Sequence, residues 1–414
     1  MHSRKLIASL IGVVALFTLT PLMSAQSTFQ TIFDFDLSDG SGPGGMVFDK
    51  AGNLYGTTFA GGTNSRGVIY KLAPNADGSW TQSILYTFSG LDGADPSSPL
   101  TFDQAGNLYG TTPYGGASGD GVVFQLVPNS NGTWTENVLH SFNGTDGAEP
   151  SSALIFDQAG NLYGTTRAGG NLLCQLTLPN GCGVAFKLTP KSDGSWSEST
   201  IHTFCSQQGC RDGGLPSDVI FDQAGNLYGT TSSSCLPYHG NNTCWGTVFK
   251  LSPNADGSWS ESVLHYFCSW GRPYCTDGAL PVDLIMDQAG NLYGTTEYGG
   301  SSAWGVVFEL LPNADGSWSE KVLQLFPGPG YAGILIFDAA GNLYCTWTTI
   351  VGYGEVFKLS PNSKGLWPET VVHTFHGRDG SIPKSLIFDS AGHLFGTTYV
   401  GGTNNHGTVF EITP

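Results

Sequence analysis

The sequence predicts an all-β protein, a seven-bladed β-propeller with four antiparallel strands per blade. One phrase, F-D-x-A-G-N-L-Y-G-T-T, recurs seven times at intervals of 51 to 65 residues. Each repeat unit contains four short apolar runs separated by turn sequences, without the three-to-four-residue apolar period of a helix. The two ends of the chain supply complementary parts of one unit. The glycines of the A-G-N turns are Gly52, Gly106, Gly160, Gly225, Gly290, Gly341 and Gly392.

The unit from residue 98 to residue 142 illustrates the four strands. Between the first two apolar runs, Gly106 and Asn107 suit the positive φ of a tight hairpin. The third run is rich in β-branched and aromatic residues, which favour strands. Four strands in about 50 residues are typical of propeller blades. We expect strands over 99–103, 107–112, 121–126 and 136–142.

The chain ends predict how the ring closes. Residues 28–35 match the fourth strand of the other units, whereas the chain stops at Pro414, directly after a third strand at 407–412. The N-terminal strand would therefore complete the last blade and leave no free sheet edge there. A β-solenoid, the alternative repeat architecture, has no use for this offset.

The N-terminus predicts export. In residues 1–25, two basic residues precede an apolar run over 6–23, as in a secretory signal peptide. We expect residues 26–414 to form a single propeller domain that is secreted to the extracellular space or periplasm. No later apolar stretch is long enough to span a bilayer.

The charge balance bears on the partners. With 16 basic and 33 acidic residues the net charge is −17, which disfavours nucleic acid and anionic lipid. We expect a monomer without a cofactor, with a glycan or an extracellular protein as its partner.

Eight of the nine cysteines form pairs that are close in sequence, all in the two longest units. In an exported chain such pairs predict local disulfides, because zinc sites usually show C-x2-C spacing. Cys345 stands where other units have the glycine of L-Y-G-T-T, and we expect a buried free thiol there. The predicted disulfides are Cys174–Cys182, Cys205–Cys210, Cys235–Cys244 and Cys268–Cys275.

The loops divide into a uniform and a varied set. The turns between strands one and two and between strands three and four hardly vary in length. The loops between strands two and three and the loops between blades vary, and they carry every cysteine pair. Because alternate turns of a meander lie at opposite ends of a sheet, the varied loops share one face of the ring, the loop face. We expect this face to carry the function.

Aromatic residues of the loop face are the candidate ligand-binding residues. Trp245 and Trp304 occupy one repeat position, just before the third strand. With aromatic neighbours they would form a stacking platform for a sugar ring or an aromatic partner. The alternative is that they pack against their own loops. The candidates are Trp245, Trp270, Trp304, Tyr238, Tyr274, Tyr298 and Arg272.

Several repeated polar residues have structural interpretations. Aspartates that precede the A-G-N turns are expected to cap those turns, and aspartates of the inter-blade loops to form hydrogen bonds between blades rather than bind calcium. Four histidines at one strand-four position lie on separate blades and cannot converge on one metal. We therefore expect no metal site. These histidines are His140, His202, His265 and His373.

The tandem unit resembles the GloVer repeat family of exported bacterial proteins. The resemblance rests on the F-D-x-A-G-N-L-Y-G-T-T phrase, the G-x-V-F strand and the D-G-S-W turn, and it covers residues 28–414. It implies a secreted, propeller-like protein and no established reaction.

Two function classes follow. The first is an extracellular binding or scaffold module that presents the cysteine-stapled loops of blades 3–5. The alternative is a carbohydrate-active propeller enzyme, a lyase or hydrolase, with Asp218 and Asp283 as candidate acid and base. The sequence contains no G-x-S-x-G, H-E-x-x-H or phosphate-binding motif, so the question of catalysis stays open.

Overall fold

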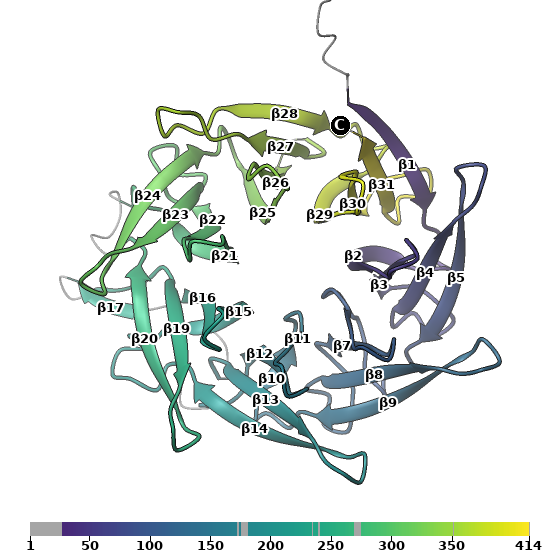
Figure 1. Ribbon diagram of the computed structural model, residues 1–414, viewed down its shortest axis with the longest axis horizontal. Coiled ribbons are helices and arrows are strands. Elements are labelled where there is room, and N and C mark those ends of the chain that lie inside the picture. Colours follow the sequence, from purple (N-terminus) through teal and green to yellow (C-terminus); the bar gives the residue numbers. More distant parts are fainter. Residues whose placement is uncertain are drawn as a thin grey trace, which may run out of the picture.

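The computed structural model describes residues 27–171, 174, 181–233, 235–238, 241–268, 275–350 and 352–413. Within these ranges the chain forms a ring of seven antiparallel sheets and no helix (Figure 1). This confirms the predicted seven-bladed propeller. Among the described residues no helix is long and apolar enough to cross a membrane. The predicted signal peptide lies outside the described residues.

Each blade proceeds from an inner to an outer strand in chain order. Blades 1 and 2 contain β2 (Ser41–Phe48), β3 (Leu54–Ala60), β4 (Val68–Pro74), β5 (Trp80–Thr87), β6 (Thr101–Phe102), β7 (Leu108–Thr112), β8 (Val122–Pro128) and β9 (Trp134–Ser141). Blade 3 contains β10 (Ala148–Pro150), β11 (Ile155–Phe156), β12 (Leu162–Ala168), β13 (Val184–Pro190) and β14 (Trp196–Thr203). Blade 4 contains β15 (Gly214–Phe221), β16 (Leu227–Ser233), β19 (Thr247–Pro253) and β20 (Trp259–Tyr266), with the hairpin β17 (Cys235–Tyr238) and β18 (Asn241–Cys244) between β16 and β19.

The remaining blades follow the same order, except that the outer strand of blade 7 is the N-terminal strand. Blade 5 contains β21 (Ala279–Met286), β22 (Leu292–Tyr298), β23 (Val306–Pro312) and β24 (Trp318–Leu325). Blade 6 contains β25 (Gly330–Phe337), β26 (Leu343–Thr349), β27 (Glu355–Leu359) and β28 (Glu369–Thr374). Blade 7 contains β29 (Ser381–Phe388), β30 (Leu394–Val400), β31 (Thr408–Thr413) and β1 (Thr28–Asp34).

The N-terminal strand closes the ring as predicted. β1 pairs antiparallel with β31, with Thr28 opposite Thr413 and Asp34 opposite Thr408. The two ends of the chain therefore lie side by side in blade 7 (Figure 1). The predicted strands of blade 2 agree with the structure within two residues at most ends, but its first strand shortens to Thr101–Phe102.

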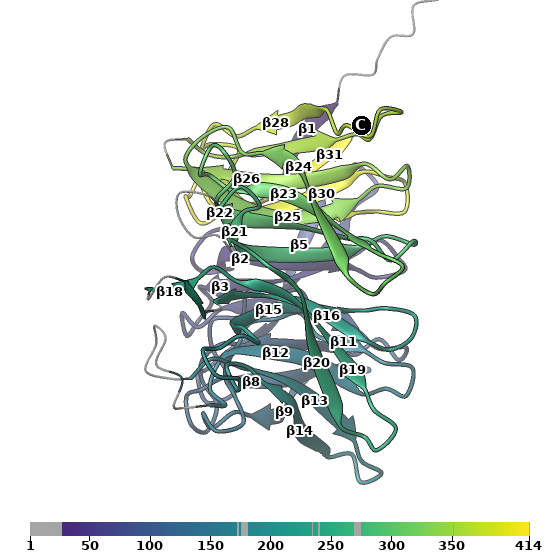
Figure 2. The ribbon, with the colours of Figure 1, turned by 90° about the vertical axis from the view of Figure 1, so that its left-hand side faces the viewer.

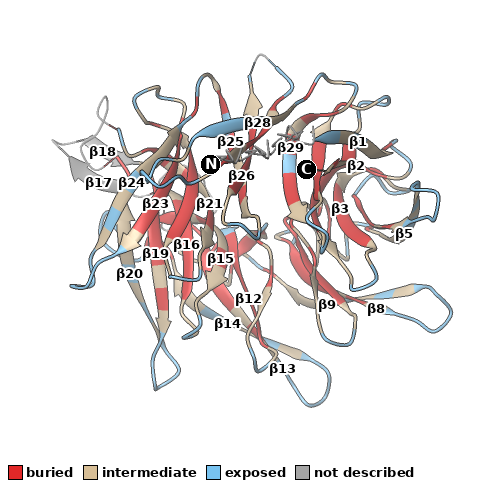
Figure 3. Ribbon diagram, turned by 45° about the horizontal axis from the view of Figure 1, so that its top comes forward, coloured by how far each residue is buried: buried red, intermediate tan, exposed pale blue. Residues whose placement is uncertain are grey.

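The core lies between neighbouring blades. A phenylalanine that follows each fourth strand is buried and meets an aromatic ring of the third strand in the next blade, as Phe142 meets Phe186 edge to face at 5.2 Å. This contact explains the glycine of L-Y-G-T-T, because a Cβ on Gly164 would lie 2.8 Å from the Phe186 ring. The outer strands and their turns are more exposed (Figure 3). The equivalent pairs are Phe35–Tyr70, Phe88–Phe124, Phe204–Phe249, Phe267–Phe308, Phe326–Phe357 and Phe375–Phe410.

The A-G-N turns carry the predicted aspartate caps. In blade 3, Oδ1 of Asp157 accepts hydrogen bonds from the amides of Ala159 and Asn161, both at 2.9 Å. Its Oδ2 accepts hydrogen bonds from the Asn161 side chain at 2.7 Å and from the Tyr163 hydroxyl at 3.1 Å. The capping interpretation of these aspartates therefore agrees with the structure.

Candidate functional site

The loop face gathers the inserted segments of blades 3 to 5. In the edge-on view, the hairpin β17–β18 projects on the side of the ring opposite to the long outer turns (Figure 2). Three of the four predicted disulfides are present in the described residues: Cys174–Cys182, Cys205–Cys210 and Cys268–Cys275. The backbone register of β17 and β18 places Cys235 opposite Cys244.

A pocket of about 400 Å³ opens on this face between blades 4 and 5. It brings together Trp245, which precedes β19, Trp304, which precedes β23, and Tyr298 at the end of β22. All three residues are half-buried. We call this site the tryptophan pocket. Its other lining residues are Cys275, Ala279, Gly299, Gly300 and Ala303.

The backbone fixes the walls of the tryptophan pocket. The carbonyl of Trp245 accepts a hydrogen bond from the amide of Leu280 at 2.7 Å, which ties blade 4 to the inner strand of blade 5. Leu280 has φ +54°, and the bend that this conformation introduces into β21 aims its amide at the neighbouring blade. The carbonyl of Cys275 accepts a hydrogen bond from the amide of Gly300 at 2.7 Å. Cys275 and the loop between β22 and β23 are therefore joined.

The aromatic residues also contribute to the fold. Trp245 and Tyr298 pack against the buried cluster of Cys268, Cys275 and Ala279, and Trp304 packs against the core between blades 5 and 6. Each of the three residues thus contributes both to a packed cluster and to the lining of the pocket.

The structure does not test every predicted ligand-binding residue. Trp270, Arg272 and Tyr274 lie outside the described residues. Tyr238 belongs to β17, for which only the backbone is described.

A second pocket, of about 490 Å³, lies beside the ring axis. It is lined by the inner strands β15 and β21 and by the ends of β12, β16 and β22. Its two charged side chains are Arg167 at the end of β12 and Glu297 at the end of β22. We call it the axial pocket. Neither residue was predicted as a site residue from the sequence.

A signal for the axial pocket exists in the repeat. Arg167 and Glu297 occupy the position that follows the two threonines of L-Y-G-T-T, which holds a different residue in every blade. In blades 1 and 7 this position carries Phe59 and Tyr399, whose rings meet at 6.2 Å. Variation at one position of a uniform repeat marks it as free to specialise. The residues there are Phe59, Pro113, Arg167, Ser232, Glu297, Thr348 and Tyr399.

The candidate acid and base, Asp218 and Asp283, join blades. Oδ1 of Asp218 accepts a hydrogen bond from the amide of Ala153 in blade 3 at 3.1 Å. Oδ2 of Asp283 accepts a hydrogen bond from the amide of Leu335 in blade 6 at 2.6 Å. Burial, and then the charge of Asp283, raises the pKa of Asp218 to about 7. The axial pocket is lined by Ser217 and Val282, their neighbours in sequence, rather than by the two aspartates.

The inter-blade aspartates hold their own loops and pair with strand-four side chains, which differs from the expected hydrogen bonds between blades. The Asp146 carboxylate accepts a hydrogen bond from the amide of Asn143 at 2.9 Å, and its Oδ2 lies 3.0 Å from Nε2 of His140. The contact across the blade interface comes from a third group, because Glu198 of blade 3 offers a carboxylate oxygen within 4.8 Å of both.

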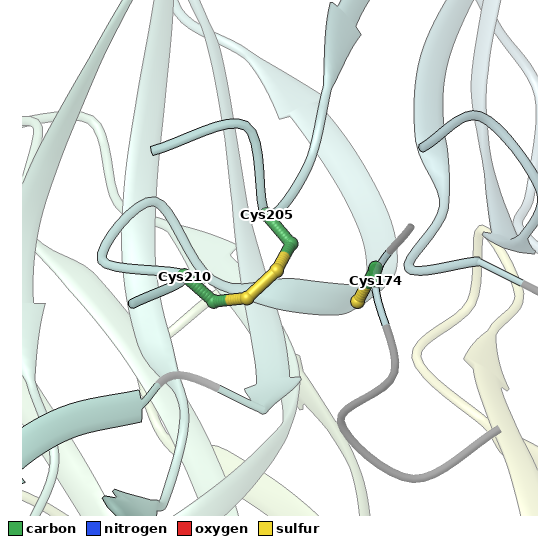
Figure 4. A group of neighbouring side chains, drawn as sticks. All are labelled: Cys174, Cys205 and Cys210. Atoms are coloured by element: carbon green, nitrogen blue, oxygen red, sulfur yellow. A yellow bond between two sulfur atoms is a disulfide. The ribbon is translucent and has the colours of Figure 1, made fainter. Parts of the chain in front are cut away.

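The donor set of this triad also suits a metal ion. Blade 1 argues for a hydrogen-bonded contact instead, because Tyr86 takes the place of the histidine there and donates to Asp92 at 2.5 Å. Among the described residues a second cluster comprises the sulfurs of Cys174, Cys205 and Cys210, which lie within 4.8 Å of one another (Figure 4). All three belong to disulfides and are not thiolates. Among the cysteines whose side chains are described, Cys345 is free and buried, as predicted.

The fold and the repeat define an all-β propeller built from seven copies of one tandem unit. A family model described as the Gloeobacter/Verrucomicrobia repeat matches residues 11–235 and 173–410. The chain belongs to this repeat family, which confirms the resemblance seen in the sequence. The curated proteins contain no match to the chain.

Solved structures share the fold at low identity. A catalytically inactive virginiamycin B lyase from Staphylococcus aureus with quinupristin is 13% identical, with a TM-score of 0.54 over 94% of this chain and 99% of that chain. A periplasmic gluconolactonase from Pseudomonas aeruginosa is 17% identical, with a TM-score of 0.53 over 87% and 95%. A putative 6-phosphogluconolactonase from Bacteroides uniformis is 14% identical, with a TM-score of 0.54 over 83% and 88%. At these identities the similarity shows the fold alone.

Proposed function

We propose that this protein is an exported binding module whose ligand is a glycan held in the tryptophan pocket. The observation that carries the proposal is the convergence of Trp245, Trp304 and Tyr298 on one pocket of about 400 Å³. Flat apolar rings at the edge of a concave, partly polar site suit the apolar face of a sugar ring. The disulfides support an extracellular or periplasmic location, where such bonds persist.

Preorganisation supports the same conclusion. The pocket walls are joined by the hydrogen bonds of Trp245 and Cys275 and by the disulfide of Cys275, so little ordering remains to be done on binding. An extracellular protein that inserts an aromatic side chain would use the same surface, and it is the alternative partner.

The test is a glycan-array screen of the mature protein beside the Trp245→Ala/Trp304→Ala double variant. Tyr353→Ala is the matched control, because Tyr353 takes the same repeat position in blade 6 and is 50% exposed. We expect the wild type and the control to bind and the double variant to lose binding. Circular dichroism should show that all three proteins are folded. Absence of glycan binding by the wild type would overturn the proposal and favour a protein partner.

One observation favours a second function, carbohydrate cleavage. The raised pKa of Asp218, near Asp283, is a feature of acid–base pairs, and the solved structures that share the fold include a lyase and lactonases. The hydrogen bonds that Asp218 and Asp283 accept from neighbouring blades favour a structural role instead. Release of sugar products from an array-positive glycan, lost in Asp218→Asn, would establish the enzyme.

A further inference from the structure

Two disulfides of blade 3 lie against each other on the loop face. Cys174–Cys182 lies in the segment between β12 and β13, and Cys205–Cys210 lies in the loop that leads from β14 to β15. The four residues form one buried cluster, in which each is between 3 and 7% exposed. The sulfur of Cys174 and both sulfurs of the second disulfide lie within 4.8 Å of one another (Figure 4). A sulfur of one disulfide is thus placed beside the bond of the other.

Hydrogen bonds of Asn171 hold Cys174 beside Cys205. The Asn171 side chain donates to the carbonyl of Cys205 at 3.0 Å, and the carbonyl of Asn171 accepts a hydrogen bond from the amide of Cys174 at 3.0 Å. One residue therefore contacts the backbones of both cysteines, although they belong to different loops. Bonded sulfurs are about 2 Å apart, so the Cys174 sulfur has to approach by at most about 3 Å to form a new disulfide. Rotation about its Cα–Cβ bond gives a displacement of that size.

Blade 4 shows a different arrangement at the equivalent position. Trp245 takes the repeat position of Cys182, directly before the glycine of the third strand, and packs against Cys268 and Cys275. Among the side chains that the structure describes, no third cysteine joins that cluster. Within the described residues, the contact between two disulfides is therefore particular to blade 3 and is not a general feature of the repeat.

We propose that these two disulfides form one thiol–disulfide exchange site, which takes two electrons from a dithiol reductant and passes them from one disulfide to the other. Residues 206–209, inside the loop of the second disulfide, are exposed and give the reductant access. A thiolate of the reductant attacks the sulfur of Cys210, and the Cys205–Cys210 bond breaks with its electron pair on Cys205. The Cys205 thiolate then attacks Cys174, so that a Cys174–Cys205 bond forms while Cys182 leaves as a thiolate. The second thiol of the reductant displaces Cys210, and the two protons of the dithiol go to Cys182 and Cys210.

The exchange changes which parts of the loop face are joined. Each disulfide of the structure links a loop to itself, whereas Cys174–Cys205 links the segment between β12 and β13 to the loop between blades 3 and 4. Because disulfides persist in oxidising compartments and open in reducing ones, the position of this link responds to the redox state around the protein. The exchange does not depend on a ligand in the tryptophan pocket.

The test is disulfide mapping of the mature Cys182→Ala variant by mass spectrometry. This substitution leaves Cys174 as a free thiol beside the second disulfide, so exchange needs no added reductant. Free thiols are blocked with N-ethylmaleimide in acid, and the protein is then digested. We expect peptides that link Cys174 to Cys205 or to Cys210 in at least about a tenth of the molecules.

Cys275→Ala is the matched control. It frees Cys268, which packs with Trp245 outside the blade 3 cluster, so both disulfides of blade 3 should keep their pairing. A second disulfide that stays intact in every Cys182→Ala molecule would overturn the inference. Altered pairing of the blade 3 cysteines in the control would also overturn it, because exchange would then not depend on contact within the cluster.

If Cys182→Ala fails to fold, the wild type provides the test. It is titrated with dithiothreitol until thiols first appear in blade 3, and the pairing is mapped in the same way. We expect free thiols at Cys182 and Cys210 together with a Cys174–Cys205 link. Thiols that appear only as the two original pairs, Cys174 with Cys182 or Cys205 with Cys210, would overturn the inference.

Discussion

Nε2 of His140 lies 3.0 Å from Oδ2 of Asp146, and the carboxylate of Glu198 from the next blade faces this pair. Equivalent His–Asp pairs occur at His202–Asp212 and His265–Asp277, at 3.6 and 3.3 Å. In each case the next outer strand carries a glutamate at its third residue. Neighbouring blades are thus in contact at their outer strands through groups whose protonation state affects the stability of the ring.

The rim glutamates predict that the ring is weakened as the pH rises. Burial, and then the charge of the preceding blade's aspartate, raises the pKa of Glu136 and Glu320 to about 7, and Glu198 and Glu261 behave alike. The folded state therefore keeps protons that the unfolded state releases from about pH 4.5 upward. Stability should fall between about pH 4.5 and 7 and then level off.

Replacing these four glutamates by glutamine removes that dependence. Denaturant unfolding of the quadruple variant should match the wild type near pH 4.5 and exceed it at pH 8. Glu369→Gln is the control, because Glu369 accepts a hydrogen bond from Gln324 at 2.7 Å instead of facing an aspartate. If the unfolding free energy of the quadruple variant still falls with pH as in the wild type, these glutamates are not the groups that titrate.

Ring closure predicts that the terminal strand is as important as any internal one. Phe35, after β1, is fully buried and equivalent to Phe142 of blade 2. We expect Phe35→Ala and Phe142→Ala each to lower the free energy of unfolding by about 3–5 kcal/mol, measured by guanidinium denaturation. A cost below about 1 kcal/mol for Phe35→Ala alone would mean that β1 does not close the ring.

The turn aspartates should affect stability without affecting binding. Asp157→Ala leaves two backbone amides, the Asn161 side chain and the Tyr163 hydroxyl without their acceptor. We expect a loss of about 1–3 kcal/mol in unfolding free energy and unchanged affinity for an array-positive glycan, because the turn lies on the face opposite to the tryptophan pocket. Loss of affinity in a folded Asp157→Ala protein would instead place the binding site on the face of the A-G-N turns.

The Cys268–Cys275 disulfide should preorganise the tryptophan pocket. Cys275 lines that pocket, whereas Cys205 and Cys210 do not. In Cys268→Ser/Cys275→Ser we expect glycan affinity to fall about three- to tenfold, because binding must then order the loop. Cys205→Ser/Cys210→Ser is the matched control and should retain full affinity. Equal losses in both variants would indicate a general effect on the fold.

The repeat explains why the sequence predicts the fold so completely. Seven copies of one unit act as an internal comparison, so strand positions, turn caps and the glycine beside Phe186 can be recognised by recurrence. The same register places Trp245 and Trp304 at one end of neighbouring blades, which is why they could be expected to converge with Tyr298.

Other parts of the site depend on the closed ring. Arg167 and Glu297 lie on blades 3 and 5, and nothing in their local sequence shows that both line one pocket beside the axis. The four histidines do lie apart, as expected, but each one's partners come from its own blade and the next. Such contacts depend on how closely neighbouring blades pack and at what angle. The spacing of residues along the chain does not reveal this geometry.

The most direct test of the central claim is a ¹⁹F NMR titration of the protein labelled with 5-fluorotryptophan, using the glycan with the strongest array signal. The ten tryptophans give separate probes, and Trp245→Phe and Trp304→Phe assign the two that matter. The account predicts that the Trp245 and Trp304 resonances shift with the ligand while those of the outer turns, such as Trp259 and Trp318, stay fixed. Saturable binding that leaves both resonances unmoved would contradict the tryptophan pocket as the binding site.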